Sequence, residues 1–198
     1  FRQFIDHDHG MISLPYIKIN WQKINKVHLI GCGTAYYSCL IAKYFFEKIA
    51  KVSTECDMAS EFRYRDPIIE DDTLFIFVSQ SGETADTYAA LEYCNIKNGQ
   101  TLSLSNVINS SIARDSNYSV YTKAGPEMGV ASTKAFTSQL TALLALAILH
   151  GTFKKTVSEA ENKSFCNEIS QAPKFIEEAI QRSYSLKNTA KDLIGSKG

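Results

Sequence analysis

The chain has 198 residues, of which 44% are hydrophobic, and its 21 Lys and Arg side chains balance 21 Asp and Glu side chains. This length is enough to bury a full core. Without a net positive charge, nucleic acid is a poor candidate for a partner.

Three units are expected along the chain. Residues 1–26 have no clear period, which predicts a strap or linker, and the start at Phe1 without Met suggests a piece of a longer protein. Residues 27–155 alternate strand and helix patterns and form the predicted main domain. Residues 156–198 are predicted to be helices that lead to a further domain.

Apolar runs rich in β-branched and aromatic residues predict five strands, at 27–30, 52–57, 73–78, 101–105 and 118–122. Helical patterns lie between and after them, at 35–50, from residue 85 to about 98, within 106–115, and at 132–150, 156–171 and 173–194. Pro173 suits the first turn of the last helix. Strands that alternate with helices predict parallel pairing and a doubly wound, flavodoxin-like α/β fold.

The most apolar stretch, 140–149, has ten residues and contains Thr141. It is too short to span a membrane, and a buried helix is expected instead. Five cysteines are scattered through the chain without a CxxC pair, at Cys32, Cys39, Cys56, Cys94 and Cys166. Neither a disulfide framework nor a zinc ribbon is therefore expected, and a reducing, cytoplasmic environment fits best.

Ligands of an open parallel sheet bind outside the carboxyl ends of its strands. Three loops qualify, 31–34, 79–84 and 125–132, and the second is the most informative. It places serine hydroxyls, a glycine and a threonine at a helix start, where unpaired N–H groups favour an anion. A phosphate is the natural guest. The alternative is that Ser79 and Ser81 only cap the helix.

Acidic side chains follow this loop. Glu83 and Asp86 lie in or near the first helical turn, where a carboxylate aimed at the loop would repel a phosphate. They are expected to point away from it.

The first loop contains Gly31-x-Gly33 but has Tyr36 where a dinucleotide-binding loop needs a third glycine, and it lacks a Walker lysine. A nucleotide cofactor is therefore not expected. Thr34 could donate to a ligand or cap the first helix. Cys32 is interpreted as a small buried residue rather than a nucleophile.

The remaining candidate groups give no metal site and no general base. His7 and His9 lack further ligands nearby, and His28 alternates within a strand and is expected to be structural. His150 is expected to cap the end of a helix, and Lys134 could meet either a ligand or a surface carboxylate.

Four segments together resemble the first sugar isomerase (SIS) domain of the glutamine:fructose-6-phosphate aminotransferase family. They are 30–38 (IGCGTAYYS), 59–65 (ASEFRYR), 79–87 (SQSGETADT) and 129–137 (GVASTKAFT). The resemblance implies a five-stranded parallel sheet and a site for a hexose 6-phosphate. The implied phosphate contacts are Ser79, Gln80, Ser81 and Thr84, and the implied sugar contacts are Cys32, Gly33, Thr34, Val130, Ala131 and Ser132. Ala35 departs from the serine of many members, so a side-chain hydrogen bond there is lost.

The family makes glucosamine 6-phosphate from fructose 6-phosphate and glutamine. Its nucleophilic cysteine, proton-shuttling glutamate, ring-opening histidine and imine-forming lysine lie in a glutaminase domain, a second SIS domain and a C-terminal tail. The resemblance therefore implies that this chain holds no catalytic residue, is inactive alone and forms homodimers. A stand-alone SIS sensor that regulates a partner and a subunit with a vestigial pocket are the alternatives.

Overall fold

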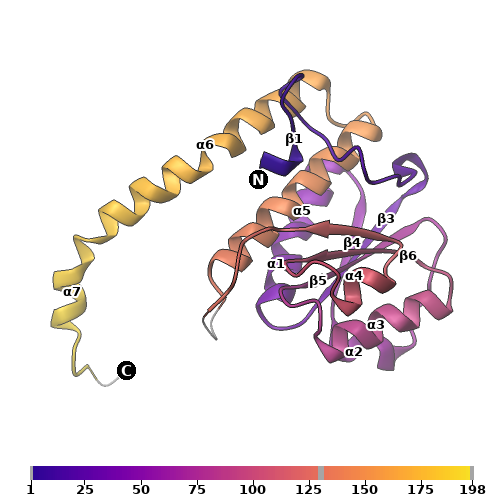
Figure 1. Cartoon of the computed structure of the whole chain (residues 1–198), viewed down its shortest axis with the longest axis horizontal. Helices are drawn as coiled ribbons and strands as arrows, with labels where there is room; N and C mark the ends of the chain where they lie inside the picture. The colour runs from indigo at the N-terminus through magenta and orange to yellow at the C-terminus, as the bar shows by residue number, and fades with distance from the viewer. Residues whose placement is uncertain (1, 129–131, 197–198) are drawn as a thin grey trace.

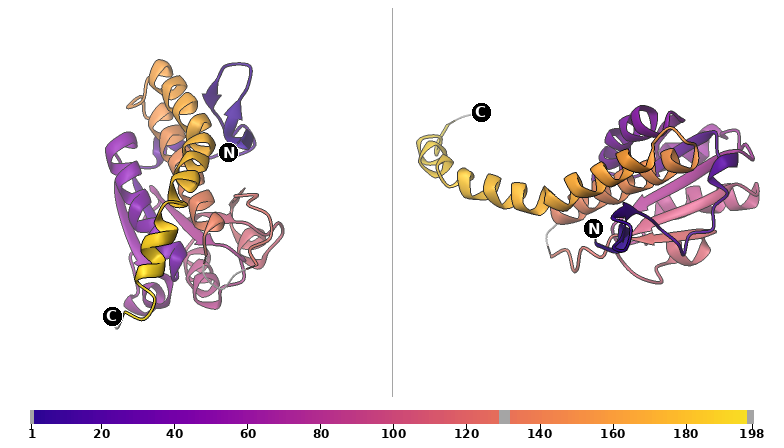
Figure 2. Two further views of the ribbon diagram at one scale, coloured as in Figure 1. Left: turned by 90° about the vertical axis from the view of Figure 1, so that its left-hand side faces the viewer. Right: turned by 90° about the horizontal axis from the view of Figure 1, so that it is seen from above.

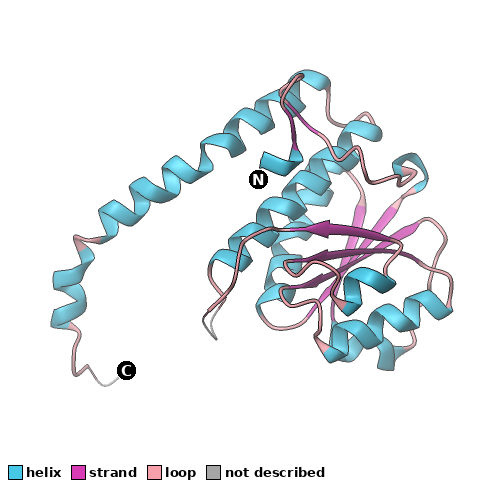
Figure 3. Cartoon of the chain, viewed as in Figure 1, coloured by secondary structure: helices cyan, strands magenta, loops and turns pink. Residues whose placement is uncertain are grey.

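A five-stranded parallel sheet forms the centre of the molecule in the computed structural model, which describes residues 2–128 and 132–196 (Figures 1 and 3). The strand order is β4-β3-β5-β6-β7. The strands are β3 (Lys26–Gly31), β4 (Ser53–Met58), β5 (Thr73–Ser79), β6 (Gln100–Ser105) and β7 (Tyr118–Tyr121). This order, second-first-third-fourth-fifth along the domain, is that of the flavodoxin-like class. The predicted doubly wound fold is confirmed.

Helices cover both faces of the sheet. One face is covered by α1 (Thr34–Phe45), its π-helical continuation η3 (Phe46–Ala50) and α5 (Lys134–Phe153). The other face is covered by α2 (Ala59–Phe62), α3 (Ala85–Ile96) and α4 (Ser111–Asp115). Short 3-10 helices also occur, η1 (Arg2–Phe4), η2 (Trp21–Lys23) and η4 (Arg63–Arg65).

Alternate side chains of β5 enter two separate cores. Leu74, Ile76 and Val78 pack on the α1–α5 side, whereas Phe75 and Phe77 pack on the α2–α3 side, and all five are fully buried. A strand buried on both faces needs a continuous apolar run, and this explains why β5 was predicted so closely.

Helix α5 is long and apolar enough to cross a membrane by length and composition alone, but 56% of its apolar window is buried inside the fold. Its buried face, which includes Ala142, Leu143 and Leu146, joins the core beside α1. The helix is longer than its ten-residue apolar stretch, and the expectation of a buried helix is confirmed.

The residues that precede the sheet pack against the core of the domain. A hairpin of two short strands, β1 (Ile5–Asp6) and β2 (Met11–Ile12), lies beside α6. Phe4 and Trp21 are each 2% exposed. Asn162 on α6 is buried and fastens this strap, since its Oδ1 accepts from the Ile12 N–H at 2.7 Å. The domain boundaries at 26 and 155 stay predictions.

The C-terminal helices differ from the prediction. A single helix, α6 (Glu159–Ser183), runs through Pro173, and the break comes only before α7 (Leu186–Asp192). A proline inside a helix removes one backbone hydrogen bond. The capping box at Ser158 and the buried Asn162 and Cys166 fix the helix before Pro173, and good helix formers follow it. The first half of α6 packs on α5, and the second half projects away from the globule with exposed side chains (Figures 1 and 2).

His150 is not a helix cap. It lies inside α5, fully buried, and its Nε2–H donates to the Ile24 carbonyl at 3.2 Å. The predicted helix end was too early because Gly151, Thr152 and Phe153 continue the helix. Trp21 packs against the imidazole with ring centroids 5.2 Å apart.

Candidate active site

A cleft of about 220 Å³ opens at the carboxyl ends of β3 and β5. These neighbouring strands mark the point where the strand order reverses, which is where open α/β sheets bind ligands. Seven predicted site residues line the cleft together: Cys32, Thr34, Ser79, Gln80, Ser81, Thr84 and Ser132. Gly33 is exposed and does not line it, and Val130 and Ala131 lie outside the described residues.

The loop after β5 is held by hydrogen bonds between its own residues. Ser79 is 2% exposed, and its Oγ accepts from the Gly82 N–H at 3.0 Å and lies 3.0 Å from Thr84 Oγ1. Ser81 Oγ accepts from the Glu83 N–H at 3.1 Å. A hydroxyl that accepts can still donate its own proton, so the Ser81 hydroxyl keeps a donor for a ligand.

The capping alternative does not describe this loop. Helix α3 begins at Ala85, whereas the two serines accept from N–H groups that precede the helix. Thr84 occupies the N-cap position, and its side chain makes no capping hydrogen bond. The first N–H groups of α3 are therefore not capped by that side chain and can bind an anion.

Gly82 fixes the shape of the loop. Its φ of +67° is a left-handed conformation that favours glycine. A Cβ at this position would lie 2.0 Å from Ser110 Oγ, because the loop packs directly on the start of α4. The Ile112 N–H donates to the Gly82 carbonyl at 3.1 Å and joins the two segments.

The cleft would bind an anion without a cationic side chain. None of the described residues that line it is a lysine, arginine or histidine. Glu83 points away from the cleft as expected, since its Oε1 accepts from the Ser111 N–H of α4 at 2.8 Å. That backbone hydrogen bond holds the pKa of Glu83 below its usual value. Lys134 is exposed and does not line the cleft.

The loop after β3 supplies the opposite wall. Thr34 is the first residue of α1 and Gly33 is the N-cap, so Thr34 does not cap the helix. Its half-buried side chain lines the cleft. Cys32 is half-buried beside it, which corrects the expectation of a fully buried cysteine. It borders the cleft because it follows the last residue of β3.

Sequence reasoning missed two polar residues of the cleft, Glu127 and Gln139. Glu127 Oε2 accepts from the Ala135 N–H at the start of α5, at 3.0 Å. Gln139 lies one turn further along α5 and is 3% exposed. Both line the cleft together with Val78 and Ser79 of β5, which are distant in sequence, so no local motif could have identified them.

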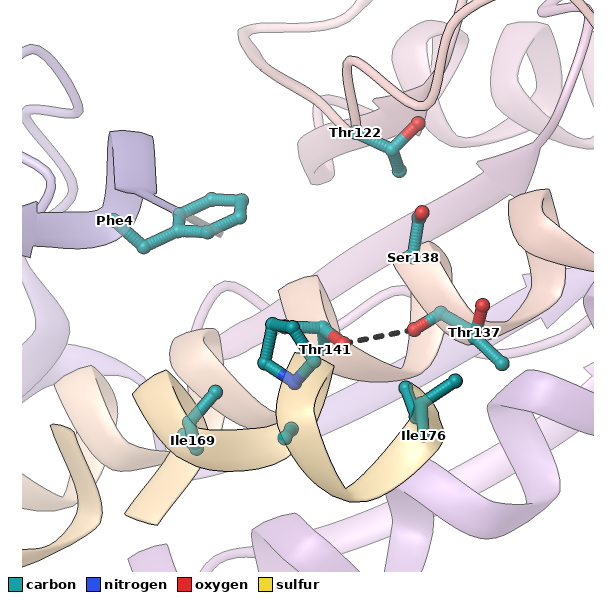
Figure 4. A pocket seen from close by; sticks show the side chains of 9 residues that line it. Phe4, Thr122, Thr137, Ser138, Thr141, Ile169 and Ile176 are labelled. Carbon is teal, nitrogen blue, oxygen red and sulfur yellow. Dashed lines mark hydrogen bonds between the residues drawn. The ribbon is translucent and has the colours of Figure 1, made fainter. Parts of the chain in front are cut away.

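A second hollow, of about 180 Å³, lies where α6 crosses α5 (Figure 4). Its walls are mostly apolar or carry hydroxyls, and the Thr141 hydroxyl donates to the Thr137 carbonyl at 2.8 Å. Ile169 and Ile176 face it from α6, and Pro173 lies between them in sequence. No charged side chain is among its described lining residues, and its polar groups are the hydroxyls of Thr122, Thr137, Ser138 and Thr141.

The histidines form no metal site in the described part of the chain, where no cluster of three or more His, Cys, Asp or Glu residues occurs. His9 Nδ1 lies 2.9 Å from Asp6 Oδ2 at the surface. His28 is 3% exposed, packs on Phe62 and Phe75, and lies 2.7 Å from Asp57 Oδ2. Its expected structural role is confirmed.

Comparison with known proteins identifies this architecture. The model of the SIS domain family matches residues 21–149. The chain belongs to the SIS domain family. The chain is 44% identical over 180 residues to glutamine–fructose-6-phosphate aminotransferase [isomerizing] of Bartonella quintana, and this match covers 91% of the chain. It is 41% identical to the protein of the same name from Clostridium tetani over 96% of the chain.

A solved structure extends this similarity. The C-terminal domain of glucosamine-fructose-6-phosphate aminotransferase from Francisella tularensis superimposes on 94% of the chain with a TM-score of 0.89 and 36% identity. The match covers 53% of that domain. The chain spans about 30% of the length of the Bartonella relative. The resemblance drawn from the four motifs is therefore confirmed for the SIS domain.

Proposed function

We propose that the chain is the sugar-phosphate-binding half of the isomerase part of a glutamine:fructose-6-phosphate aminotransferase. The observation that carries the proposal is the loop after β5, which presents Ser81, Thr84 and the start of α3 to a cleft at the reversal point of the sheet. The relatives named above support the choice of fructose 6-phosphate, and the five free cysteines fit a reducing, cytoplasmic setting.

The proposed role is binding rather than chemistry. Imine formation and ring opening need a lysine and a histidine, and the cleft has neither among its described lining residues. The loop after β5 would hold the phosphate, and the loop after β3 would border the sugar. Conversion to glucosamine 6-phosphate would then require groups from the rest of such an enzyme.

Ser81→Ala tests the phosphate role. We expect the affinity for fructose 6-phosphate to fall about ten- to hundredfold, because a hydrogen bond to a charged group contributes roughly 1.5–3 kcal/mol. The free energy of unfolding should fall by less than about 1.5 kcal/mol, since the mutation removes only the bond from the Glu83 N–H at an exposed loop. Isothermal titration calorimetry and denaturant unfolding measure the two effects.

The controls separate this role from a general loss of structure. Ser116→Ala removes a serine hydroxyl that donates to the Ile112 carbonyl and lies outside the cleft, and it should leave the affinity unchanged. Unphosphorylated fructose should bind far more weakly than its 6-phosphate. Equal binding of both sugars by the wild type, or unchanged affinity in Ser81→Ala, would show that the loop is not a phosphate site.

We also propose that the protein self-associates. Helix α5 is largely buried in the fold, whereas the outer half of α6 is exposed. Exposed apolar residues lie at four-residue spacing at the outer end of α6, at Ile176, Ile180 and Tyr184, the residue that follows the helix. Sedimentation velocity should show dimers that dissociate in the Ile176→Glu, Ile180→Glu double variant, and a monomeric wild type at micromolar concentration would contradict the proposal.

A further inference from the structure

Gln139 carries a buried polar atom that the fold leaves without a partner. The residue lies on α5 and lines the cleft, although its side chain is 3% exposed. Its Oε1 is buried and has no hydrogen-bond partner among the described residues. The other buried residues of this helix face nearby are Ala135, Ala142 and Leu143.

An unpaired buried acceptor destabilises a fold, and an apolar side chain of the same size would not. The neighbouring buried positions of α5 are apolar, so an apolar side chain at position 139 would also suit the packing. A ligand in the cleft can supply the missing hydrogen-bond partner of the carboxamide, because the Gln139 side chain borders the cleft.

The two sides of the cleft differ in the hydrogen-bonding groups that they carry. The loop after β5 offers donors, namely the Ser81 hydroxyl and the first N–H groups of α3. The opposite side carries the Gln139 carboxamide, with its unpartnered acceptor Oε1 and the donor Nε2, and the Glu127 carboxylate ahead of α5, of which one oxygen is already bonded to the Ala135 N–H. A phosphate dianion has acceptors only and suits the first wall, whereas a sugar hydroxyl can donate to the second.

We propose that Gln139 accepts a hydrogen bond from a hydroxyl of the bound sugar phosphate and so selects polyhydroxy phosphate esters over phosphate alone. This inference rests on the proposed function of the cleft. The proposed hydrogen bond orients the ligand, with the phosphate against the loop after β5 and the hydroxylated carbon chain against α5. Gln139 would act as a specificity and positioning residue.

Gln139→Met is the sharpest test, since methionine keeps the length of the side chain and removes its polar atoms. We expect the affinity for fructose 6-phosphate to fall about three- to tenfold, the loss of one neutral hydrogen bond, while the affinity for inorganic phosphate stays unchanged. The midpoint of thermal unfolding should not decrease, because the variant removes an unpaired buried acceptor.

Thr73→Val is the matched control. Thr73 Oγ1 is also buried without a hydrogen-bond partner among the described residues, but Thr73 lies at the opposite end of β5 from Ser79. This variant should change neither affinity.

Three results would overturn the inference. They are unchanged affinity of Gln139→Met for fructose 6-phosphate, equal losses for the sugar phosphate and for inorganic phosphate, and a lower unfolding midpoint, which would reveal a structural partner of the carboxamide. The proposed function fails separately, and this inference with it, if the wild type binds fructose 6-phosphate no better than fructose.

Discussion

Gly82→Ala should lower the free energy of unfolding by about 2–4 kcal/mol and abolish measurable binding of fructose 6-phosphate. A left-handed conformation costs an alanine at least about 1 kcal/mol, and forcing atoms into a packed site costs roughly 1–3 kcal/mol more. The new Cβ would lie 2.0 Å from Ser110 Oγ and 2.4 Å from Ser110 Cβ, so the loop must move away from α4. That movement separates the Gly82 N–H from Ser79 Oγ, and it displaces the proposed phosphate donors.

Gly10→Ala provides the matched control for backbone strain. Gly10 has a similar φ of +62°, but no atom lies within 4 Å of a Cβ built there. We expect this variant to lose only about 1 kcal/mol and to keep its affinity. Adding Ser110→Gly to Gly82→Ala should recover part of the stability. Denaturant unfolding and calorimetric titration test both expectations, and equal losses in Gly82→Ala and Gly10→Ala would disprove the proposed steric conflict.

The sheet and two walls of the site follow from local sequence. The run that became β5 is apolar at every position from Leu74 to Val78, a pattern typical of a strand buried on both faces. The polar loops follow directly from the strand ends, because parallel strands bring their carboxyl ends to one edge. These features depend on residues that are neighbours in the chain.

The features that the sequence did not predict depend on long-range packing. Gln139 is the sixth residue of α5 and lies between Ser138 and Leu140, so nothing in its surroundings in the sequence distinguishes it from a surface glutamine. It enters the cleft because α5 packs on α1 and places Gln139 next to the loops after β3 and β5. Pro173 misled the prediction for the same reason, since the contacts of Asn162 and Cys166 hold α6 in place before the proline.

Acid should destabilise the protein through His150. Burial lowers the pKa of this histidine from 6.5 to about 4, because the charged imidazole would lose its hydration inside the fold. Its surroundings support this direction, with Trp21 and Phe46 packed against the ring. The nearby charge of Lys154 lowers the pKa further.

The sign of the effect follows from proton binding in the two states. Between pH 6.5 and about 4 the unfolded chain binds a proton at His150 that the folded protein does not bind. The free energy of unfolding should therefore decrease as the pH falls through this window, by roughly 3 kcal/mol in total, and His150 should have no such effect above pH 6.5. His150→Gln removes the titration and keeps an N–H that can donate to the Ile24 carbonyl. The difference in unfolding free energy between wild type and His150→Gln, followed by urea denaturation from pH 7.5 to 4, should narrow on acidification, whereas His7→Gln at an exposed position should track the wild type. A constant difference across that range would mean that His150 titrates alike in the folded and unfolded chains.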